Sequence, residues 1–384
     1  MSEYEKVSID YEKLLRGHYE ADSLPKDFSV DRVVPDFGFN LLNRRGLLYT
    51  PLADLHYLER GGKKPVWPAG KSFAVCLTHD VDAVSLHSFD ELLRERWSNI
   101  RGSTSILRRV LNLVRLGLDW LRRGREKDPL HCYEMWLSTE SDVKAHSTFL
   151  FSPGIGSVTK LHKMDYRYDL DDPITFDGQD CTVAEMIKTI DERSWEIGLH
   201  PSWYSFNDED EMKRQKEALE NVLQHDIVSV RQHCLHCDIR VTPSVQHAAG
   251  FKYDSTLGFN DNVGFRFGTC YPWRLYDLQG GKEIPMFEIP LIVQDTALLS
   301  YVKGLRLDEN TAFQYIMQIT DAVEQVGGVL TLLWHTNYID NPDWWNLYLR
   351  VLHYLEKRNA WFGSIREIGE WWKDMNRHVR EGVT

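Results

Sequence analysis

Long apolar runs are missing from this sequence, and no stretch reaches the roughly 18 apolar residues that a membrane-spanning helix needs. Residues 1–15 are charged and contain no apolar core segment, so we expect no signal peptide. The chain has 6 cysteines among 384 residues, which is too few for the disulfide framework of a small secreted protein. These absences favour a cytoplasmic location.

Positive charge is also scarce, because 45 lysines and arginines against 57 aspartates and glutamates leave a net charge of −12. A nucleic-acid-binding protein needs an excess of basic residues to neutralise phosphates, so we expect no nucleic-acid partner.

One segment, about residues 91–127, is nevertheless basic. Its apolar residues recur at helical spacing: Leu107, Val110, Leu111, Val114, Leu118 and Leu121. We favour an insertion helix that packs this stripe on the body of the protein. The alternative is a helix over residues 105–125 that lies on an anionic membrane surface, which gains weight if the substrate is lipid-linked.

The chain divides into an irregular beginning and a regular remainder. Residues 1–70 show no clear helical or strand period, and we interpret them as an N-terminal extension packed on the main domain, with small strands of its own. In residues 71–384, strand patterns alternate with helical patterns, which predicts an α/β domain with a parallel sheet. Predicted strands cover residues 73–77, 146–151, 195–199, 227–230, 288–293 and 328–334, and predicted helices cover residues 182–193, 208–224, 243–249, 309–325, 345–357 and 365–375.

The stretch over residues 72–82 combines a buried strand with a polar end. Residues 73–77 are a continuous apolar run, typical of a parallel strand covered on both faces. Asp80 and Asp82 point to the same side, because side chains alternate along a strand. Two adjacent carboxylates repel each other unless a cation or a proton separates them. A lone Asp-x-Asp is more often a polar loop that caps a helix, so the pair needs support from other residues.

That support comes from the ends of other predicted strands. Polar residues lie at or just after their carboxyl ends: His200, Arg231, His233 and His335. In a β/α barrel these ends converge on one face, where catalytic groups collect. We therefore expect these residues and the aspartate pair to share one site.

The order of these motifs resembles that of the polysaccharide deacetylase family, also called carbohydrate esterase family 4. The resemblance covers about residues 71–375 and rests on Thr78–Asp82, Ser147–Phe151, Glu196–Ser205, Arg231–His233 and Leu332–His335. It implies a distorted (β/α)7 barrel as the catalytic domain, with residues 1–70 as an extension in front of it.

The resemblance also implies a role for each residue in amide hydrolysis. Asp82 and His200 would hold a metal ion that lowers the pKa of a bound water. Asp80 would act as the general base, and Arg231 would keep it ionised and oriented. His335 would protonate the departing nitrogen.

The sequence departs from the family pattern at the proposed metal site. The usual adjacent aspartates are separated by a valine, and Tyr204 replaces the second metal histidine. His233, where the pattern has proline, is a candidate replacement ligand or catalytic group. Asp254 and Asp295 are both candidates to orient the catalytic histidine, and the sequence does not choose between them.

Aromatic and cysteine residues near the motifs have two interpretations each. Trp203, Tyr204 and Trp334 are candidate substrate-binding residues of a sugar-sized cleft, although packing in the core is the commoner role of such tryptophans. The segment His233–Cys237 has the sequence HCLHC, which suits half of a separate structural zinc site. No second such pair stands at a matching distance, so we favour incidental loop residues.

We therefore expect a metal-dependent amidase that removes an N-acyl group, with acetyl preferred, from an amino sugar or sugar conjugate. The expected cofactor is a divalent metal ion, with zinc preferred. One alternative is a hydrolase of another linear or cyclic amide, and the other is a degenerate barrel that binds carbohydrate without catalysis. Tyr204 favours the degenerate barrel, whereas the retention of Asp80, Arg231 and His335 argues against it.

Overall fold

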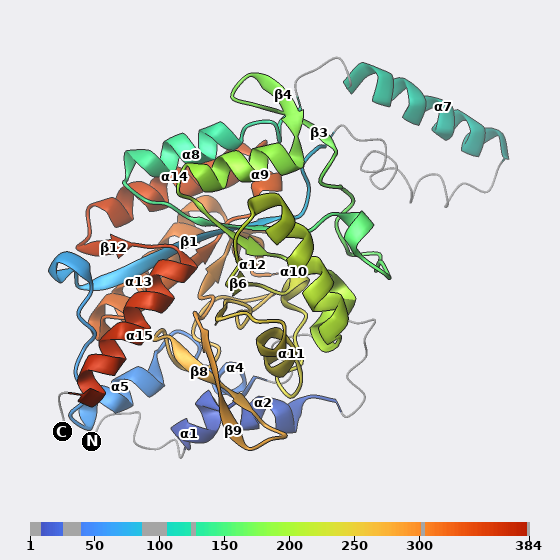
Figure 1. The fold of residues 1–384 in the computed structure, drawn as a ribbon. Coiled ribbons are helices and arrows are strands. Elements are labelled where there is room, and N and C mark those ends of the chain that lie inside the picture. The colour runs from blue at the N-terminus through green and yellow to red at the C-terminus, as the bar shows by residue number, and fades with distance from the viewer. Residues whose placement is uncertain (1–8, 26–39, 87–105, 124–127, 301–303, 382–384) are drawn as a thin grey trace.

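The computed structural model of the chain describes residues 9–25, 40–86, 106–123, 128–300 and 304–381. Its centre is a ten-stranded sheet that curls into an open, distorted barrel (Figure 1). In spatial order the strands are β10 (Val293–Gln294), β11 (Val329–Leu333), β1 (Phe73–Val81), β2 (Thr148–Phe151), β5 (Glu196–Leu199), β6 (Ser229–Val230), β7 (Tyr253–Asp254), β9 (Lys282–Glu288) and β8 (Trp273–Asp277), while β12 (Ala360–Phe362) pairs with β1. Every pairing in this sheet is parallel except that of β8 with β9. The expected α/β class and distorted barrel are confirmed.

Strand β1 pairs with three other strands and is buried along its whole length. It pairs with β11 from Ala74 to Thr78, with β12 at its beginning, and with β2 from Thr78 to Val81. Because side chains alternate, Thr78 and Asp80 face the barrel interior while His79 faces the outer helices. The strand extends four residues beyond the predicted apolar run and so carries Asp80 within it.

Helices cover the outside of the barrel, and the main hydrophobic core lies between them and the sheet (Figure 1). They are α8 (Tyr133–Asp142), α9 (Val183–Glu192), α10 (Glu209–Leu223), α11 (Thr242–Ala248), α12 (Asp295–Leu299), α13 (Glu309–Val326), α14 (Pro342–Glu356) and α15 (Ile365–Glu381). Their ends follow signals in the sequence. Thr182 and Glu185 form a capping box at the start of α9, and Asp308 caps α13. Gly327 ends α13 at a φ of 76°.

The described part of residues 1–70 forms helices, so the expectation of small strands there is wrong. The helices are α1 (Tyr11–Leu15), α2 (His18–Ser23), α4 (Leu41–Arg44) and α5 (Leu52–Glu59). Two buried carboxylates join them to the loop between β7 and β8. Glu20 pairs with Arg266 at 2.6 Å, and Asp54 accepts a hydrogen bond from the backbone N–H of Cys270 at 2.8 Å.

Two hairpins escaped the sequence-based prediction. Strands β3 (Pro173–Phe176) and β4 (Gln179–Thr182) form a separate antiparallel pair, and β8 turns back to pair with β9. The predicted strand over residues 288–293 is the end of β9 and the beginning of β10. Pro290 lies between them and has no N–H to donate to a neighbouring strand, which explains the break in this apolar run.

The basic segment contains helix α7 (Ile106–Arg123), which stands apart from the barrel (Figure 1). The interpretation that its apolar stripe packs on the body is wrong. The stripe residues with described side chains are between 48% and 61% exposed: Val110, Leu111, Val114, Leu118 and Leu121. The rest of the predicted insertion, residues 91–105 and 124–127, lies outside the described residues. In the described part of the chain, no helix is both long and apolar enough to cross a membrane.

Candidate functional site

The structure brings together the polar residues at the carboxyl ends of β1, β5, β6 and β11. Arg231 follows β6 and is fully buried. Its guanidinium Nη1 donates hydrogen bonds to Asp80 Oδ1 at 2.9 Å and to Thr78 Oγ1 at 2.8 Å. Its Nε and Nη2 donate to the carbonyl oxygen and the hydroxyl of Ser255. These four bonds fix the guanidinium, which in turn holds Asp80 in one orientation by a charge-assisted bond.

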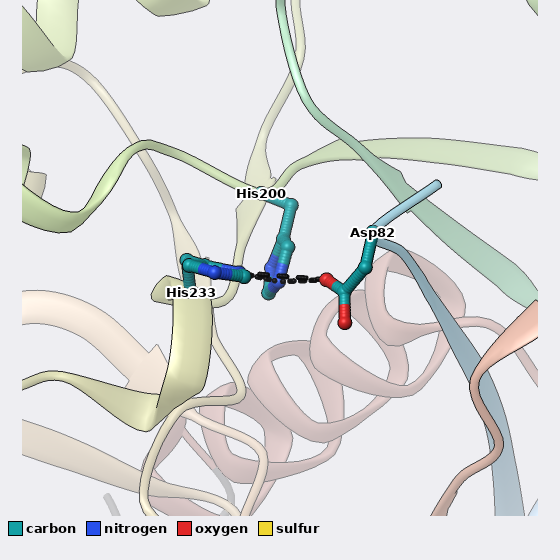
Figure 2. Close-up of side chains that lie close together, drawn as sticks. All are labelled: Asp82, His200 and His233. Carbon is teal, nitrogen blue, oxygen red and sulfur yellow. Dashed lines mark hydrogen bonds and ion pairs between the residues drawn. The ribbon is translucent and has the colours of Figure 1, made fainter. Parts of the chain in front are cut away.

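His200 reaches the same place from the end of β5, which lies between β2 and β6. A Cβ on Gly198 would lie 2.9 Å from the Leu150 side chain and 3.1 Å from the Ser229 carbonyl oxygen. Glycine at this position therefore allows the three strands to pack closely. His233 follows β6 in a 3₁₀ turn, His233–Leu235, and faces His200 across the site (Figure 2).

Asp82, His200 and His233 form a compact group of three metal-type ligands (Figure 2). The two facing nitrogens, His200 Nε2 and His233 Nδ1, are 3.1 Å apart. Each lies 3.4 Å from Asp82 Oδ1. This carboxylate oxygen is buried and has no hydrogen-bond partner apart from these two nitrogens.

The outer hydrogen bonds of the two imidazoles fix where their protons lie. His200 Nδ1 is 2.8 Å from the Arg231 carbonyl oxygen, and His233 Nε2 is 2.7 Å from the Met164 carbonyl oxygen. A carbonyl oxygen can only accept, so both outer nitrogens carry the hydrogen. In the neutral imidazoles the two inner nitrogens then present lone pairs to each other, which is repulsive unless a cation or an added proton lies between them.

The donor set therefore fits a divalent metal ion. Two imidazole nitrogens and one carboxylate oxygen converge, each nitrogen is oriented by a backbone carbonyl, and the oxygen has no other partner. This is the ligand count and type of many catalytic zinc sites, which keep further positions open. Burial opposes ionisation of Asp82, but the imidazoles of His200 and His233 hold the pKa of this carboxyl well below its ordinary value.

His335 follows β11 and lies on the other side of Asp82, with its Nε2 3.9 Å from Asp82 Oδ2. Asp295 orients it, since its carboxylate accepts hydrogen bonds from the His335 backbone N–H at 2.8 Å and from Nδ1 at 2.6 Å. Burial disfavours the charged imidazole, but the Asp295 carboxylate outweighs it, with help from Asp82 and Asp80, and raises the pKa of His335 to about 10. Of the two candidates, Asp295 is therefore the one that contacts and orients His335. Asp254 accepts hydrogen bonds from Thr256 and Gln246 instead.

These groups open on one cavity of about 250 Å³. Its lining combines charged, amide and hydroxyl groups: Asp80, Asp82, His200, Cys234, Leu235, Asn260, Gln294, Thr296, Ser300, His335 and Tyr338. The sequence-based prediction missed Asn260, Gln294, Thr296, Ser300 and Tyr338. Gln294 could have been found, because it ends a strand immediately before Asp295. The others lie in a helix start, in a short 3₁₀ helix or in loops, none of which has a period that the sequence reveals.

The three aromatic residues predicted to bind substrate do not line this cavity. Trp203 is 1% exposed and stacks on His236 with ring centroids 3.9 Å apart. Trp334 is 2% exposed and packs on Tyr348. For these two tryptophans the prediction is wrong, because their rings are packed in the core. Tyr204 lies outside the metal group, with the Lys160 ammonium 3.9 Å from its ring centroid.

Neither cysteine of the HCLHC segment belongs to a group of metal-type ligands in the described part of the chain. Cys234 lines the cavity, and Cys237 is buried. Among the described residues, the only group of three or more His, Cys, Asp or Glu side chains close enough to hold a metal ion is Asp82, His200 and His233.

Comparison with solved structures identifies the fold. No family model and no curated protein matches the sequence. The chain nevertheless has the distorted β/α barrel of the polysaccharide deacetylases.

Two solved structures carry this assignment. A protein from Mycobacterium smegmatis assigned as a polysaccharide deacetylase aligns with a TM-score of 0.53 and 19% identity, over 82% of this chain and 95% of that chain. The allantoinase Puue aligns with a TM-score of 0.50 and 14% identity, over 81% of this chain and 93% of that chain. At such identities the likeness establishes the fold alone, and function must be argued from the site.

Proposed function

We propose that this chain is a metal-dependent hydrolase of the polysaccharide deacetylase family that removes an N-acyl group, with acetyl preferred, from an amino sugar or sugar conjugate. The observation that carries the proposal is the convergence of three lone-pair donors, Asp82, His200 and His233, between two polar pairs. Asp80 is paired with Arg231 on one side, and a histidine is paired with Asp295 on the other. A site that only bound carbohydrate would need neither an oriented base nor an oriented acid.

The geometry supports a role for each residue. Asp82, His200 and His233 would hold a divalent cation, with zinc preferred, which when bound supplies a Lewis acid for the substrate carbonyl and the hydrolytic water. Asp80 accepts a proton from that water as its oxygen attacks the carbonyl carbon. His335 donates its proton to the nitrogen as the C–N bond breaks, so that the products are a carboxylic acid and an amine.

Arg231 and Asp295 act as positioning residues in this scheme. Arg231 holds Asp80 in one orientation by a 2.9 Å hydrogen bond. Asp295 holds His335 by a 2.6 Å hydrogen bond and favours its charged form, which is the form that can give up a proton. The base is therefore oriented, and the acid carries the proton that the departing nitrogen needs.

The cavity supports a small polar substrate. Side-chain amides of Asn260 and Gln294 and hydroxyls of Ser300 and Tyr338 line it, and such groups hydrogen-bond to sugar hydroxyls. Its 250 Å³ suit a group of about one sugar ring rather than several. The likeness to an allantoinase favours, as a second candidate, the hydrolysis of another small linear or cyclic amide.

The test uses the full chain purified without a nickel column. We expect about one equivalent of a divalent metal by mass spectrometry, since three ligands make one site. Asp80→Asn should lower hydrolysis of N-acetylated amino sugars by about 10²- to 10⁴-fold, the usual contribution of a general base, and should retain the metal. Asp343→Asn, the same change at an exposed aspartate on α14, is the control and should remain fully active.

The results separate the candidates. Failure to take up a metal on titration, or an Asp80→Asn variant as active as wild type, would contradict the proposed mechanism. Hydrolysis of small cyclic amides with no release of acetate from acetylated amino sugars would support the second candidate instead.

A further inference from the structure

Helix α7 belongs to an insertion whose two ends are joined at the site end of the barrel. Asp128 accepts hydrogen bonds from the Ser85 hydroxyl at 2.6 Å and from the Leu86 backbone N–H at 3.2 Å. Both partners lie a few residues after Asp82, at the carboxyl end of β1. The insertion therefore leaves and re-enters the barrel at one point beside the candidate site, and α7 is attached there while standing clear of the barrel (Figure 1).

One face of α7 exposes an unusual amount of apolar surface. Six large aliphatic side chains are between 48% and 61% exposed: Val110, Leu111, Leu113, Val114, Leu118 and Leu121. Helical spacing places all six on one continuous arc of the helix. The long helices of the barrel bury their aliphatic stripe against the sheet, as α13 does with Ile316, Ile319 and Val323. An exposed arc of this size needs a binding partner.

The charge of the helix indicates which partner. Between residues 106 and 123 the sequence has one acidic residue, Asp119, against Arg108, Arg109, Arg115, Arg122 and Arg123. Arg108, Arg115 and Arg122 recur every seven residues, and helical spacing puts these three positions along one edge of the apolar arc. Arg115 is exposed. The chain as a whole carries a net charge of −12, so this basic helix is an exception within an acidic protein.

We propose that α7 binds this protein to the surface of an anionic lipid bilayer. Acyl chains receive the aliphatic arc, and negatively charged headgroups receive the arginines beside it. Pairing of α7 with the same helix of a second copy would cover the aliphatic arc but would bring like charges together. The helix lies on the bilayer surface and does not cross it, since it is not apolar enough to span a membrane. The attachment at Asp128 then keeps the site cavity close to the membrane, whatever reaction it performs.

The test is sedimentation of the full chain with lipid vesicles. Vesicles that contain phosphatidylglycerol should bind the protein, vesicles of phosphatidylcholine alone should bind it weakly, and added salt should weaken binding to the anionic ones. The double variant Val114→Glu/Leu118→Glu places two carboxylates in the arc and should lower binding by about tenfold or more. These side chains are exposed, so the variant should unfold at the same temperature as wild type.

A matched control makes the same change of charge elsewhere. Val66 and Leu349 are exposed apolar residues outside α7, and Val66→Glu/Leu349→Glu should bind anionic vesicles as wild type does. The proposal is overturned if wild type does not bind anionic vesicles, or if the control loses binding as strongly as the α7 variant. It is also overturned if wild type is a dimer that the α7 variant converts to a monomer, because the arc would then be covered by a second copy.

Discussion

His233 offers the sharpest test of the proposed metal centre, because it would supply one of three ligands from a position where the family pattern has proline. Replacing His233 with glutamine removes the nitrogen that faces His200 at 3.1 Å. His236→Gln is a matched control. It makes the same change three residues on, at a histidine that is equally buried, at 4% exposed, but stacks on Trp203 and lies outside the ligand group.

The expected magnitude follows from the ligand count. Partners that only orient a metal ligand contribute about 10- to 100-fold to affinity, so loss of a ligand itself should cost about 100-fold or more. With metal at 100 times the wild-type Kd, binding stabilises the wild-type fold by about 2.7 kcal/mol. The same metal concentration would then only equal the variant's Kd, and the stabilisation should fall to about 0.4 kcal/mol. Urea unfolding with metal or with a chelator measures both values.

A second readout reports on the facing nitrogens. Burial opposes the charged form of His233, but Cys234 and Asp82 raise the pKa of its imidazole well above its ordinary value, so the metal-free protein holds a proton there at neutral pH. Metal binding to wild type should release about one proton, and binding to the variant should release less. Titration calorimetry in buffers of different ionisation enthalpy measures the release. Equal affinity in His233→Gln and wild type, or equal losses in His233→Gln and His236→Gln, would refute the assignment.

Three further changes test the rest of the site and the fold. Asp295→Asn removes the charge that raises the pKa of His335 to about 10, so the alkaline limb of the pH–rate profile should move down towards neutral pH; an unmoved limb would contradict His335 as the acid. Burial raises the pKa of Asp54 from 3.8 to about 7, against hydrogen bonds that lower it, so wild type loses stability as pH rises from about 4 to 7. Asp54→Asn should lack this loss, worth about 4 kcal/mol in urea unfolding, and parallel pH curves would contradict the idea. Glu140→Gln breaks a buried 2.6 Å pair with His79 and should cost about 3 kcal/mol, whereas the exposed control Glu356→Gln should cost almost nothing.

The sequence predicts the site residues that lie at the ends of strands, because the pattern of a strand shows where it ends. Asp80 lies near the end of β1, and Asp82 and His335 follow β1 and β11, whose burial shows as continuous apolar runs. Parallel strands bring their carboxyl ends together. Side chains alternate along β1, so Asp80 faces the barrel interior and His79 faces the outer helices. The cavity residues Asn260 and Ser300 lie in loops. A loop has no regular spacing of apolar residues from which the direction of a side chain could be predicted, so only the structure shows that these two residues line the cavity.

Periodicity also predicts a helical face without predicting what covers it. The stripe of α7 has the spacing of a core-facing helix, and the same spacing suits a bilayer surface. For Trp203 and Trp334, the sequence gives the position of the residue but not the direction of its ring. Their place beside His200 and His335 suggested a cleft, but the direction of a ring depends on its neighbours, and both rings turn into the core.

The position of Tyr204 does not by itself make the barrel a remnant, because a neighbouring strand delivers the missing nitrogen. β5 and β6 are adjacent, so a residue in the turn after β6 lies close to His200 at the end of β5. The turn that does so contains two consecutive non-glycine residues in the left-handed region, Cys234 with a φ of 54° and Leu235 with a φ of 52°. Each costs about 1–2 kcal/mol, and such strain is retained mainly where function requires it. It presents His233 to His200 and places both strained residues in the wall of the cavity.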